Sequence, residues 1–322
     1  MTELIPTASE MTKRQTSQYW QIATSENTRK AYQTDIRHFI SSGGLLPTTT
    51  EGLLNYLNQQ AGLLNPRTLK RRLVAIKNWH TYQGFKDPTI HPIIKKTLRG
   101  IARTHGQPPI KAQILLVEQL TSIATALINS SSLIDIRDNA LLQIGFFGAF
   151  RRSELVAITW NNISFVQEGI EILIPRSKTD PEATGEICAI PYGSTLPLCP
   201  VTALKRWQEV SGLSSGTVFR SIRYRQKEYN IHTKPISPAT VSSILKRRAG
   251  ACQLPNATQY SGHSLRRGFA TAASQRGASL GAIMRQGRWH HEATVYGYIE
   301  AGQRFEANAA SFILEQSTAD DT

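Results

Sequence analysis

The run from Ala140 to Phe150 constrains the fold of this chain more than any other segment. Its side chains are apolar or glycine except for Gln143. With 11 residues it is too short to cross a bilayer, which takes about 20 residues. A segment this apolar has to be buried inside a folded domain. We predict that it belongs to a core helix over residues 135–160, preceded by another helix over residues 116–130.

The sequence pattern changes from helical to alternating after this predicted helix. Residues 169–175 and 185–191 alternate between apolar and other side chains, and a polar connection joins them, which predicts a β-hairpin. Proline or serine at the start of three later segments predicts further helices, over residues 201–210, 239–249 and 264–275. This part of the chain is therefore expected to be mainly α with a small antiparallel β-sheet.

The N-terminal third predicts a separate helical domain. Helical spacing of apolar residues indicates helices over residues 25–40 and 51–60. Asn65 and the proline after it are typical of a helix start. A basic helix over residues 93–103 is followed by Thr-His-Gly-Gln-Pro-Pro, a composition typical of linkers. A chain of 322 residues suits two domains, and we place the boundary near residues 104–112.

The helix expected after Asn65 has two distinct faces. One sector of a helical wheel holds the apolar residues Leu69, Leu73, Ile76 and Trp79. A roughly opposite sector holds the basic residues Arg67, Lys70, Arg71 and Lys77. Viewed alone, this basic stripe is as consistent with a solvated helix face as with a face that contacts DNA phosphates.

The charge of the chain favours a polyanionic partner. The formal net charge is +14 and the isoelectric point is near 9.9, which makes nucleic acid the leading candidate. Residues 1–105 hold 15 Lys and Arg residues against 6 Asp and Glu residues, so the surplus is concentrated there. No apolar stretch reaches the length of a membrane span and no signal-peptide core is evident, so we expect no membrane contact and a cytoplasmic location.

The three cysteines, Cys188, Cys199 and Cys252, include no Cys-x-x-Cys pair. An odd number without such a pair indicates neither a disulfide framework nor a zinc module. We expect packing residues in a reducing compartment.

Two pairs of residues are candidates for phosphate chemistry. Arg151 follows the apolar run and Glu154 lies about one helical turn later, so Arg151 has either a role in a pocket or a salt bridge to Glu154. His263 and Arg266 lie at an expected helix start, where both side chains and free backbone N–H groups can face one phosphate. Neither pair is specific by itself.

The combination of these pairs with a distant tyrosine is much more specific. The segment from His263 reads His-Ser-Leu-Arg-Arg-Gly-Phe-Ala-Thr, and Tyr298 lies 32 positions after Arg266. With the Arg-x-Ser-Glu-Leu box at Arg151 and a lysine, Lys178, in the hairpin connection, the chain resembles the tyrosine recombinases of the phage integrase family. The resemblance covers nearly the whole chain and is weaker in the N-terminal part.

The resemblance implies a role for each matching residue. Arg151 is similar to the first catalytic arginine of the family, with Glu154 as its acidic support, and Lys178 to the hairpin lysine. His263 and Arg266 match the central pair. Tyr298 matches the nucleophile.

The family has a His or, in Cre-like members, a Trp nine residues before the nucleophile, where this chain has Trp289. A tryptophan donates only through its indole N–H. Whether His290 or His291 shares this role stays open. Tyr296 lies about 200° from Tyr298 on a helix, and we assign it to core packing. The adjacent histidines have no third ligand at suitable spacing, so we expect no metal.

These residues suit cleavage of a phosphodiester. Arg151 and Arg266 can clamp the charge of its nonbridging oxygens. Attack by Tyr298 gives a phosphotyrosyl ester of similar energy, so no cofactor is expected. His263 can accept the tyrosine proton, and Lys178 can protonate the leaving 5′ oxygen.

The resemblance also implies an organisation. It indicates a helical, SAM-like core-binding domain at residues 10–105, a linker at 106–112, a catalytic domain at 113–316 and a disordered tail at 317–322. Family members hold DNA in a C-shaped clamp between the two domains, which would place the basic stripe at the phosphates.

The implied partners are double-stranded DNA with paired half-sites and further copies of the chain. The apolar segment within residues 303–316 is expected to dock on a neighbouring subunit of a tetramer, or else on its own domain. A type IB topoisomerase and a DNA-binding protein without catalysis are the alternatives. The resemblance leaves open whether the chain integrates, excises or resolves a mobile element or plasmid, and whether accessory proteins are needed.

Overall fold

The computed structural model describes residues 24–108, 112–175, 185–225, 228–302 and 310. The chain divides into two compact units, Met1–Ile110 and Lys111–Thr322. Each unit has a hydrophobic core of its own. No helix among the described residues is both long and apolar enough to span a membrane.

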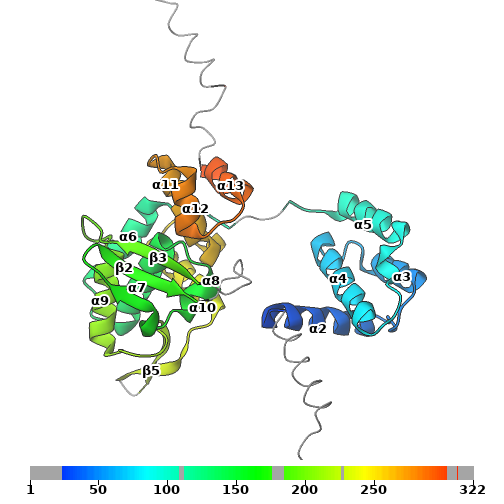
Figure 1. Cartoon of the computed structure of the whole chain (residues 1–322), viewed down its shortest axis with the longest axis horizontal. Coiled ribbons are helices and arrows are strands. Elements are labelled where there is room, and N and C mark those ends of the chain that lie inside the picture. Colours follow the sequence, from blue (N-terminus) through cyan, green and yellow to red (C-terminus); the bar gives the residue numbers. More distant parts are fainter. Residues whose placement is uncertain (1–23, 109–111, 176–184, 226–227, 303–309, 311–322) are drawn as a thin grey trace, which may run out of the picture. The chain divides into compact units, whose positions relative to one another are not determined.

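The first unit is helical over its described residues. Its helices are α2 (Glu26–Ser41), α3 (Thr50–Gln60), α4 (Pro66–Tyr82) and α5 (Pro92–His105), with the 3-10 helix η1 (Pro88–Ile90) (Figure 1). Side-chain oxygens of Ser25, Thr49 and Asn65 accept backbone N–H groups at the starts of α2, α3 and α4, which satisfies donors that a helix start leaves free. The helices predicted for this part of the chain are confirmed.

The second unit surrounds its core with more helices and two small sheets. Its helices are α6 (Val117–Ile128), α7 (Leu133–Phe147), α8 (Arg152–Ala157), α9 (Pro200–Ser211), α10 (Pro238–Ala251), α11 (Gly262–Gln275), α12 (Leu280–Gly287) and α13 (Glu292–Gly302), with the 3-10 helices η2 (Trp160–Asn162) and η3 (Ala257–Gln259). The strands are β1 (Ile163–Phe165), β2 (Gly169–Ile174), β3 (Glu186–Pro191), β4 (Arg220–Arg225) and β5 (Glu228–Pro235).

The predicted β-hairpin is confirmed as β2 and β3. They pair antiparallel, with Ile172 opposite Cys188, and β1 adds a third strand on the other side of β2. Ile170, Ile172 and Ile174 are buried because alternate residues of a strand face the same side. A second antiparallel pair, β4 and β5, was not predicted. The fold is therefore mainly α with small antiparallel sheets.

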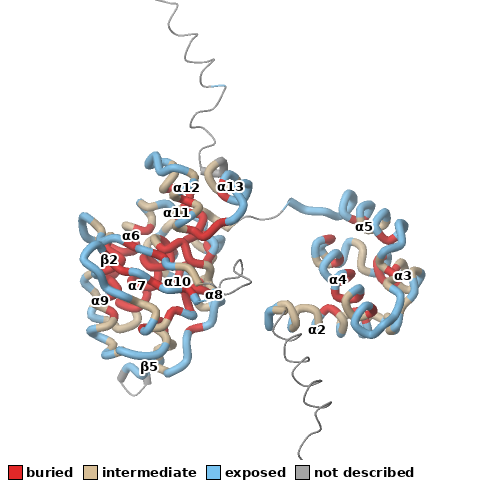
Figure 2. The backbone as a smooth tube through the Cα atoms, viewed as in Figure 1, coloured by how far each residue is buried: buried red, intermediate tan, exposed pale blue. Residues whose placement is uncertain are grey.

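Helix α7 lies at the centre of the second unit. Every residue from Ile136 to Phe146 is buried, as the red tube of this helix shows (Figure 2). The apolar run of the sequence forms the second half of α7 and the turn that follows it, and apart from the half-buried Phe147 it is buried as expected. The first half instead buries polar residues, among them Asp138.

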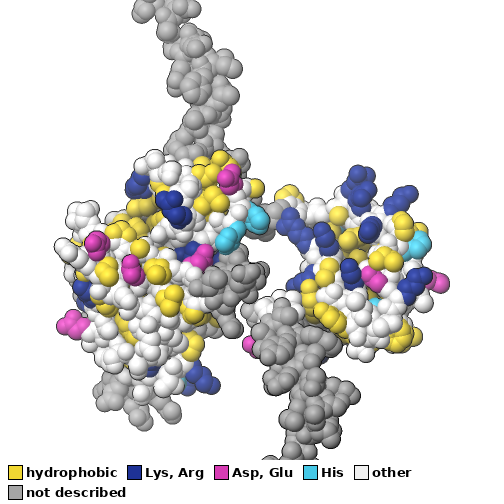
Figure 3. Space-filling model, viewed as in Figure 1, with side chains coloured by type: hydrophobic (Ala, Val, Ile, Leu, Met, Phe, Trp, Pro, Cys, Tyr) yellow, Lys and Arg dark blue, Asp and Glu magenta, His cyan; other side chains and the backbone are white. Residues whose placement is uncertain are grey.

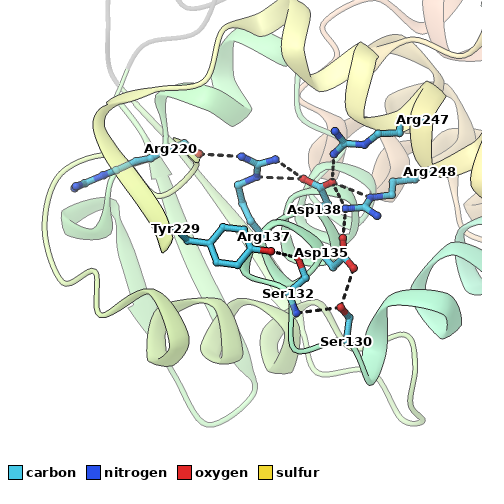
Figure 4. Close-up of polar contacts among 9 residues, drawn as sticks. All are labelled: Ser130, Ser132, Asp135, Arg137, Asp138, Arg220, Tyr229, Arg247 and Arg248. Atoms are coloured by element: carbon cyan, nitrogen blue, oxygen red, sulfur yellow. Dashed lines mark hydrogen bonds and ion pairs between the residues drawn. The ribbon is translucent and has the colours of Figure 1, made fainter. Parts of the chain in front are cut away.

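The carboxylate of Asp138 is fully buried and holds three guanidinium groups (Figure 4). Arg137 from α7 and Arg247 from α10 each place Nη2 at 2.6 Å from one of its oxygens. Arg248, also from α10, donates through Nε at 2.8 Å. A buried carboxylate needs such partners because its desolvation is otherwise costly. This ion-pair network ties α10 to α7.

The predicted single helix over residues 135–160 is wrong. The helix ends at Phe147, and a turn through Gly148, Ala149 and Phe150 leads into the separate helix α8. Ala149 has a φ of 45°, in the left-handed region that ends a helix. Phe150 then folds back so closely that a Cβ at Gly148 would lie 2.1 Å from its ring. The break places Arg151 at the start of α8.

The cysteines are free, and Cys188 and Cys199 are buried. This agrees with the packing role expected for them.

Candidate active site

Arg151 and Glu154 form a close ion pair at the start of α8. Arg151 Nη1 lies 2.6 Å from Glu154 Oε1, and the backbone N–H of Arg151 donates to Glu154 Oε2 at 2.9 Å. The Glu154 side chain is only 4% exposed, whereas that of Arg151 is 20% exposed. Burial alone would raise the pKa of Glu154, but these hydrogen bonds and the charges of Arg151 and Arg288 hold the pKa below its ordinary value. A buried, ionised Glu154 therefore fixes a partly exposed Arg151.

Helix α11 carries His263 and Arg266 on its first two turns. Ser261 caps the helix by accepting the N–H of His263 at 3.2 Å. A Cβ at Gly262 would lie 2.0 Å from the Arg152 side chain, so only glycine lets α11 approach α8 this closely. The sequence thus places His263 and Arg266 beside the start of α8.

His263 is exposed at the surface of this cluster, although part of its ring is covered by protein. That partial burial, followed by the charges of Arg152 and Arg266, lowers the pKa of His263 below its ordinary value. A lowered pKa keeps the imidazole neutral near pH 7. A neutral histidine can accept a proton.

Arg266 is 3% exposed and connects three parts of the cluster. Its Nη1 donates to the Ala149 carbonyl at 2.5 Å, and its guanidinium carbon lies 4.2 Å from the ring centroid of Trp289. Among the described residues, Nη2 of Arg266 has no hydrogen-bond partner. Burial, and after it the charge of Arg151, lowers the pKa of Arg266 to about 9. A cation so placed is stabilised by an anion, so the cluster favours binding of a phosphate group.

Trp289, which lies against Arg266, also packs against Tyr298. Their ring centroids are 5.9 Å apart at an interplanar angle of 60°, and both residues belong to a small apolar cluster around Ala149, Ala270 and Val295. Thr271 of α11 also donates its hydroxyl to the Tyr298 carbonyl at 3.0 Å, which ties α13 to α11. The tyrosine is half-buried, and Tyr298, Trp289 and Arg266 lie in successive contact.

The assignment of Tyr296 to core packing is wrong, because its side chain is 47% exposed. The residues around it explain this: Val295 points into the apolar cluster, and its neighbour on a helix therefore faces away. His290 and His291 are exposed as well.

Lys178 lies outside the described residues. Its place in the sequence is the connection between β2 and β3, which is described up to Pro175 and again from Gly185. Within the described residues there is no group of three or more His, Cys, Asp or Glu side chains that could hold a metal ion.

Two arginines beside the site were not predicted. Arg288 is 4% exposed and its Nη2 lies 3.4 Å from Glu154 Oε2. The guanidinium carbon of Arg267 lies 5.7 Å from the ring centroid of Tyr298. Arg267 directly follows Arg266, and Arg288 directly precedes Trp289. This adjacency to a predicted site residue is the only signal for them in the sequence.

The basic stripe of α4 is exposed, in a unit whose visible face carries many Lys and Arg side chains (Figure 3). Arg71 differs from the other three residues of the stripe. It forms two hydrogen bonds of 2.8 Å with Asp35 of α2, whose side chain is fully buried. Arg67, Lys70 and Lys77 have no ion pair among the residues that the structure describes.

The fold is that of site-specific recombinases. The chain is similar to the XerH site-specific recombinase bound to a palindromic difH substrate, with a TM-score of 0.59, 17% identity, and coverage of 91% of this chain and 79% of that one. It is also similar to residues 75–356 of lambda integrase, solved as a dimer bound to a COC′ core site. There the TM-score is 0.59 at 16% identity, with coverage of 94% of this chain and 98% of the other.

Sequence comparison identifies the family. Residues 113–304 match the model of the phage integrase family. An integrase/recombinase xerD homolog of Selenomonas ruminantium is 36% identical over 293 residues, which are 88% of this chain and 84% of that protein. Recombinase cre of Escherichia phage P1 is 25% identical over 267 residues, 79% of this chain and 76% of the relative. The chain belongs to the phage integrase family of tyrosine recombinases.

Proposed function

We propose that the chain cleaves and rejoins double-stranded DNA at specific sites through a 3′-phosphotyrosyl intermediate on Tyr298. The observation that carries this proposal is the contact series from Arg266 to Trp289 to Tyr298, with Arg151 close enough to lower the pKa of Arg266. It supports a site in which two arginines and one tyrosine act on the same phosphate. A phosphodiester between them is clamped by the arginines and attacked by the phenol oxygen.

The reaction conserves the energy of the phosphodiester bond that it breaks, because a phosphotyrosyl ester of similar energy replaces it. The Tyr298 oxygen forms a bond to phosphorus, the bond from phosphorus to the 5′ oxygen breaks, and the tyrosine proton passes to His263. Lys178 supplies the proton that the leaving 5′ oxygen takes up. The reverse sequence rejoins the strand. Arg151 and Arg266 act most strongly as negative charge builds up on the nonbridging oxygens, and the indole N–H of Trp289 donates to one of them.

The role of Lys178 can be isolated through the leaving group. A substrate with sulfur in place of the bridging 5′ oxygen releases a thiolate, which needs no protonation. We expect Lys178→Ala to cleave the ordinary substrate about 10²- to 10⁴-fold more slowly than the wild type, and the sulfur substrate at a similar rate. A defect that persists with sulfur would contradict the role of a general acid.

We assign residues 10–105 to a core-binding domain, 106–112 to a linker, 113–316 to the catalytic domain and 317–322 to a tail. The exposed basic residues of α4 support phosphate binding by the first of these. We further propose paired half-sites, a synaptic tetramer held by residues 303–316, and a cytoplasmic location. One structural relative is a lambda integrase tetramer bound to a Holliday junction. Integration, excision or resolution of a mobile element or plasmid would each use this chemistry.

The test is to trap the covalent intermediate. Tyr298→Phe protein first selects its site from fragments of the DNA flanking its own gene. A nicked duplex of that site then loses a short strand on cleavage, which prevents religation. With EDTA present, we expect a covalent adduct on Tyr298 by peptide mass spectrometry, formed by the wild type and by the exposed control Tyr296→Phe.

Adduct formation by Tyr298→Phe would refute the proposed nucleophile. Relaxation of a supercoiled plasmid without the selected site would favour a topoisomerase. Tight, site-specific binding without adduct would favour a DNA-binding protein that has lost catalysis.

A further inference from the structure

Arg288 occupies a backbone conformation that normally favours glycine. Its φ and ψ are 54° and 50°, in the left-handed region, just after α12 ends. The N–H of Arg288 donates to the Arg285 carbonyl at 3.1 Å, and the N–H of Trp289 donates to the Met284 carbonyl at 3.0 Å. These two bonds form a Schellman motif, in which glycine is the usual left-handed residue. Arginine there carries strain that glycine would avoid, and the contacts of its side chain offset that strain.

The turn also directs Trp289 into the site. In a Schellman motif, the residue after the left-handed position commonly packs back on the helix end. Trp289 does so: a Cβ at Gly287 would lie 1.8 Å from its ring, and Trp289 and Met284 belong to the same apolar cluster. The backbone of Arg288 therefore determines where the Trp289 ring lies under Arg266.

The side chain of Arg288 reaches the other half of the site. Nη1 donates to the Gln286 carbonyl at 2.8 Å, and Nη2 donates to the Gly148 carbonyl at 3.0 Å. Nη2 also lies 3.4 Å from Glu154 Oε2, the oxygen that accepts the backbone N–H of Arg151. The guanidinium carbon lies 4.7 Å from the ring centroid of Phe150. The cation thus holds the turn between α7 and α8 and the carboxylate that fixes Arg151.

We propose that Arg288 is a positioning residue for both halves of the phosphate-binding cluster. Its backbone fixes the position of the Trp289 ring, which stacks on Arg266. Its guanidinium fixes the position of the Glu154 carboxylate, which holds Arg151. Both phosphate-binding arginines are aligned through one buried residue that does not touch the phosphate itself. This inference rests on the proposed function of the same site.

Arg288→Gly separates this role from that of a helix end. Glycine relieves the strain of the left-handed turn and keeps the Schellman motif, while the guanidinium is lost. We expect single-turnover cleavage of the nicked duplex, at saturating DNA, to slow about 10- to 100-fold, the loss of one buried charged hydrogen-bonding group. The Kd for DNA should stay within about threefold, because the phosphates still meet Arg151 and Arg266.

Two further variants test the route through Glu154. Glu154→Gln combined with Arg288→Gly should cleave no more slowly than Glu154→Gln alone, since Arg288 then has no carboxylate to hold. Arg288→Lys should recover part of the rate, because its ammonium can replace one hydrogen bond. Arg285→Gln, an exposed arginine on α12, is the matched control and should cleave at the wild-type rate.

Hydrogen exchange gives a readout that does not depend on cleavage. In Arg288→Gly, the peptide covering residues 148–158 should exchange faster, since the N–H of Arg151 bonds to Glu154. The peptide covering α7 should not change. Wild-type cleavage by Arg288→Gly, fully additive losses in the double variant, or equal exchange in both proteins would each overturn the proposal. A wild type that forms no adduct would instead refute the proposed function, and exchange would still decide the role of Arg288.

Discussion

The guanidinium of Arg266 stacks on the ring of Trp289 at 4.2 Å, and this contact places a buried cation directly over the residue that packs on Tyr298. Trp289 can contribute to cleavage in two ways, by stacking on the Arg266 cation and by donating its indole N–H, and substitutions can separate the two. Trp289→Phe keeps an aromatic face and loses the donor. We expect its single-turnover cleavage to slow about 10- to 100-fold, as for one hydrogen bond to a charged group. Single-turnover reactions with the nicked duplex, quenched at a series of times, measure this rate.

Trp289→Ala should be the more damaging change. It removes the support of Arg266 and leaves a cavity, with a loss of stability of about 3–5 kcal/mol. Equal cleavage rates for the Phe and Ala variants would show that the ring face contributes nothing to positioning Arg266.

His263 should give cleavage an acid limb below the ordinary histidine pKa of 6.5. Only the neutral imidazole accepts the tyrosine proton, and it is present above the pKa, so the rate should fall as the pH drops through the lowered value. The charge of Arg152 contributes to this lowering. We therefore expect Arg152→Gln to shift the acid limb to higher pH, and His263→Gln to abolish it. If the wild type, Arg152→Gln and His263→Gln all gave the same pH–rate profile, His263 would be excluded as the base.

Sequence patterns predicted the elements whose signals are local. Helix α4 begins where Asn65 caps it, and the strands β2 and β3 follow their alternating residues. The turn at Ala149 was missed because the run around it is apolar throughout. The turn combines a local contact with a long-range one: Phe150 packs back on Gly148, and Arg266 donates to the Ala149 carbonyl from α11, 117 residues later in the chain.

The candidate site shows the same division. The positions of Arg151, His263, Arg266 and Tyr298 were readable because a family pattern spans them. Arg288 has no such pattern, and its role depends on a left-handed turn and on Glu154, 134 residues earlier in the chain. The pair of β4 and β5 was missed although Ile222 and Tyr224 alternate with polar residues in β4, because an alternation of only two apolar positions in a strand is a weak signal. Part of its anchorage comes from Arg137 of α7, which donates to the Arg220 carbonyl at 3.2 Å (Figure 4).

The basic stripe of α4 should divide into two kinds of residue. Each phosphate contact contributes about 0.9 to the slope of log K against log salt. Replacing Arg67, Lys70 and Lys77 together by Gln should lower this slope by about 2–3 and leave stability nearly unchanged. Fluorescence anisotropy over a range of salt concentrations measures it.

Arg71→Gln should mainly change stability. Asp35 is fully buried and loses two hydrogen bonds of 2.8 Å, at a cost of about 1–3 kcal/mol. Arg71→Gln could instead change the slope of log K against log salt by one third as much as the triple variant does, with no loss of stability. That result would show that Arg71 contacts phosphate.

Loss of the Asp138 carboxylate should strongly destabilise the second unit. Its side chain is fully buried and receives Arg137, Arg247 and Arg248, whose side chains are 6%, 56% and 13% exposed. Asp138→Asn leaves three cations around a neutral amide, two of them largely buried. Breaking a buried ion pair from one side costs about 3–5 kcal/mol, because the remaining charge is left unpaired.

The measurement should follow α7 itself, since a chain of two units need not unfold in one step. Native-state hydrogen exchange of amides in Leu133–Phe147 reports the free energy of opening of this helix. We expect Asp138→Asn to lower that free energy by about 3–5 kcal/mol, while Arg247→Gln, which removes the most exposed partner, lowers it by less than about 1 kcal/mol. The first unit, which shares no residue with this network, should exchange as in the wild type. Equal effects of the two substitutions would mean that the exposed pair of Arg247 and Asp138 alone holds α10 to α7, and that the buried Arg137 and Arg248 contribute nothing further.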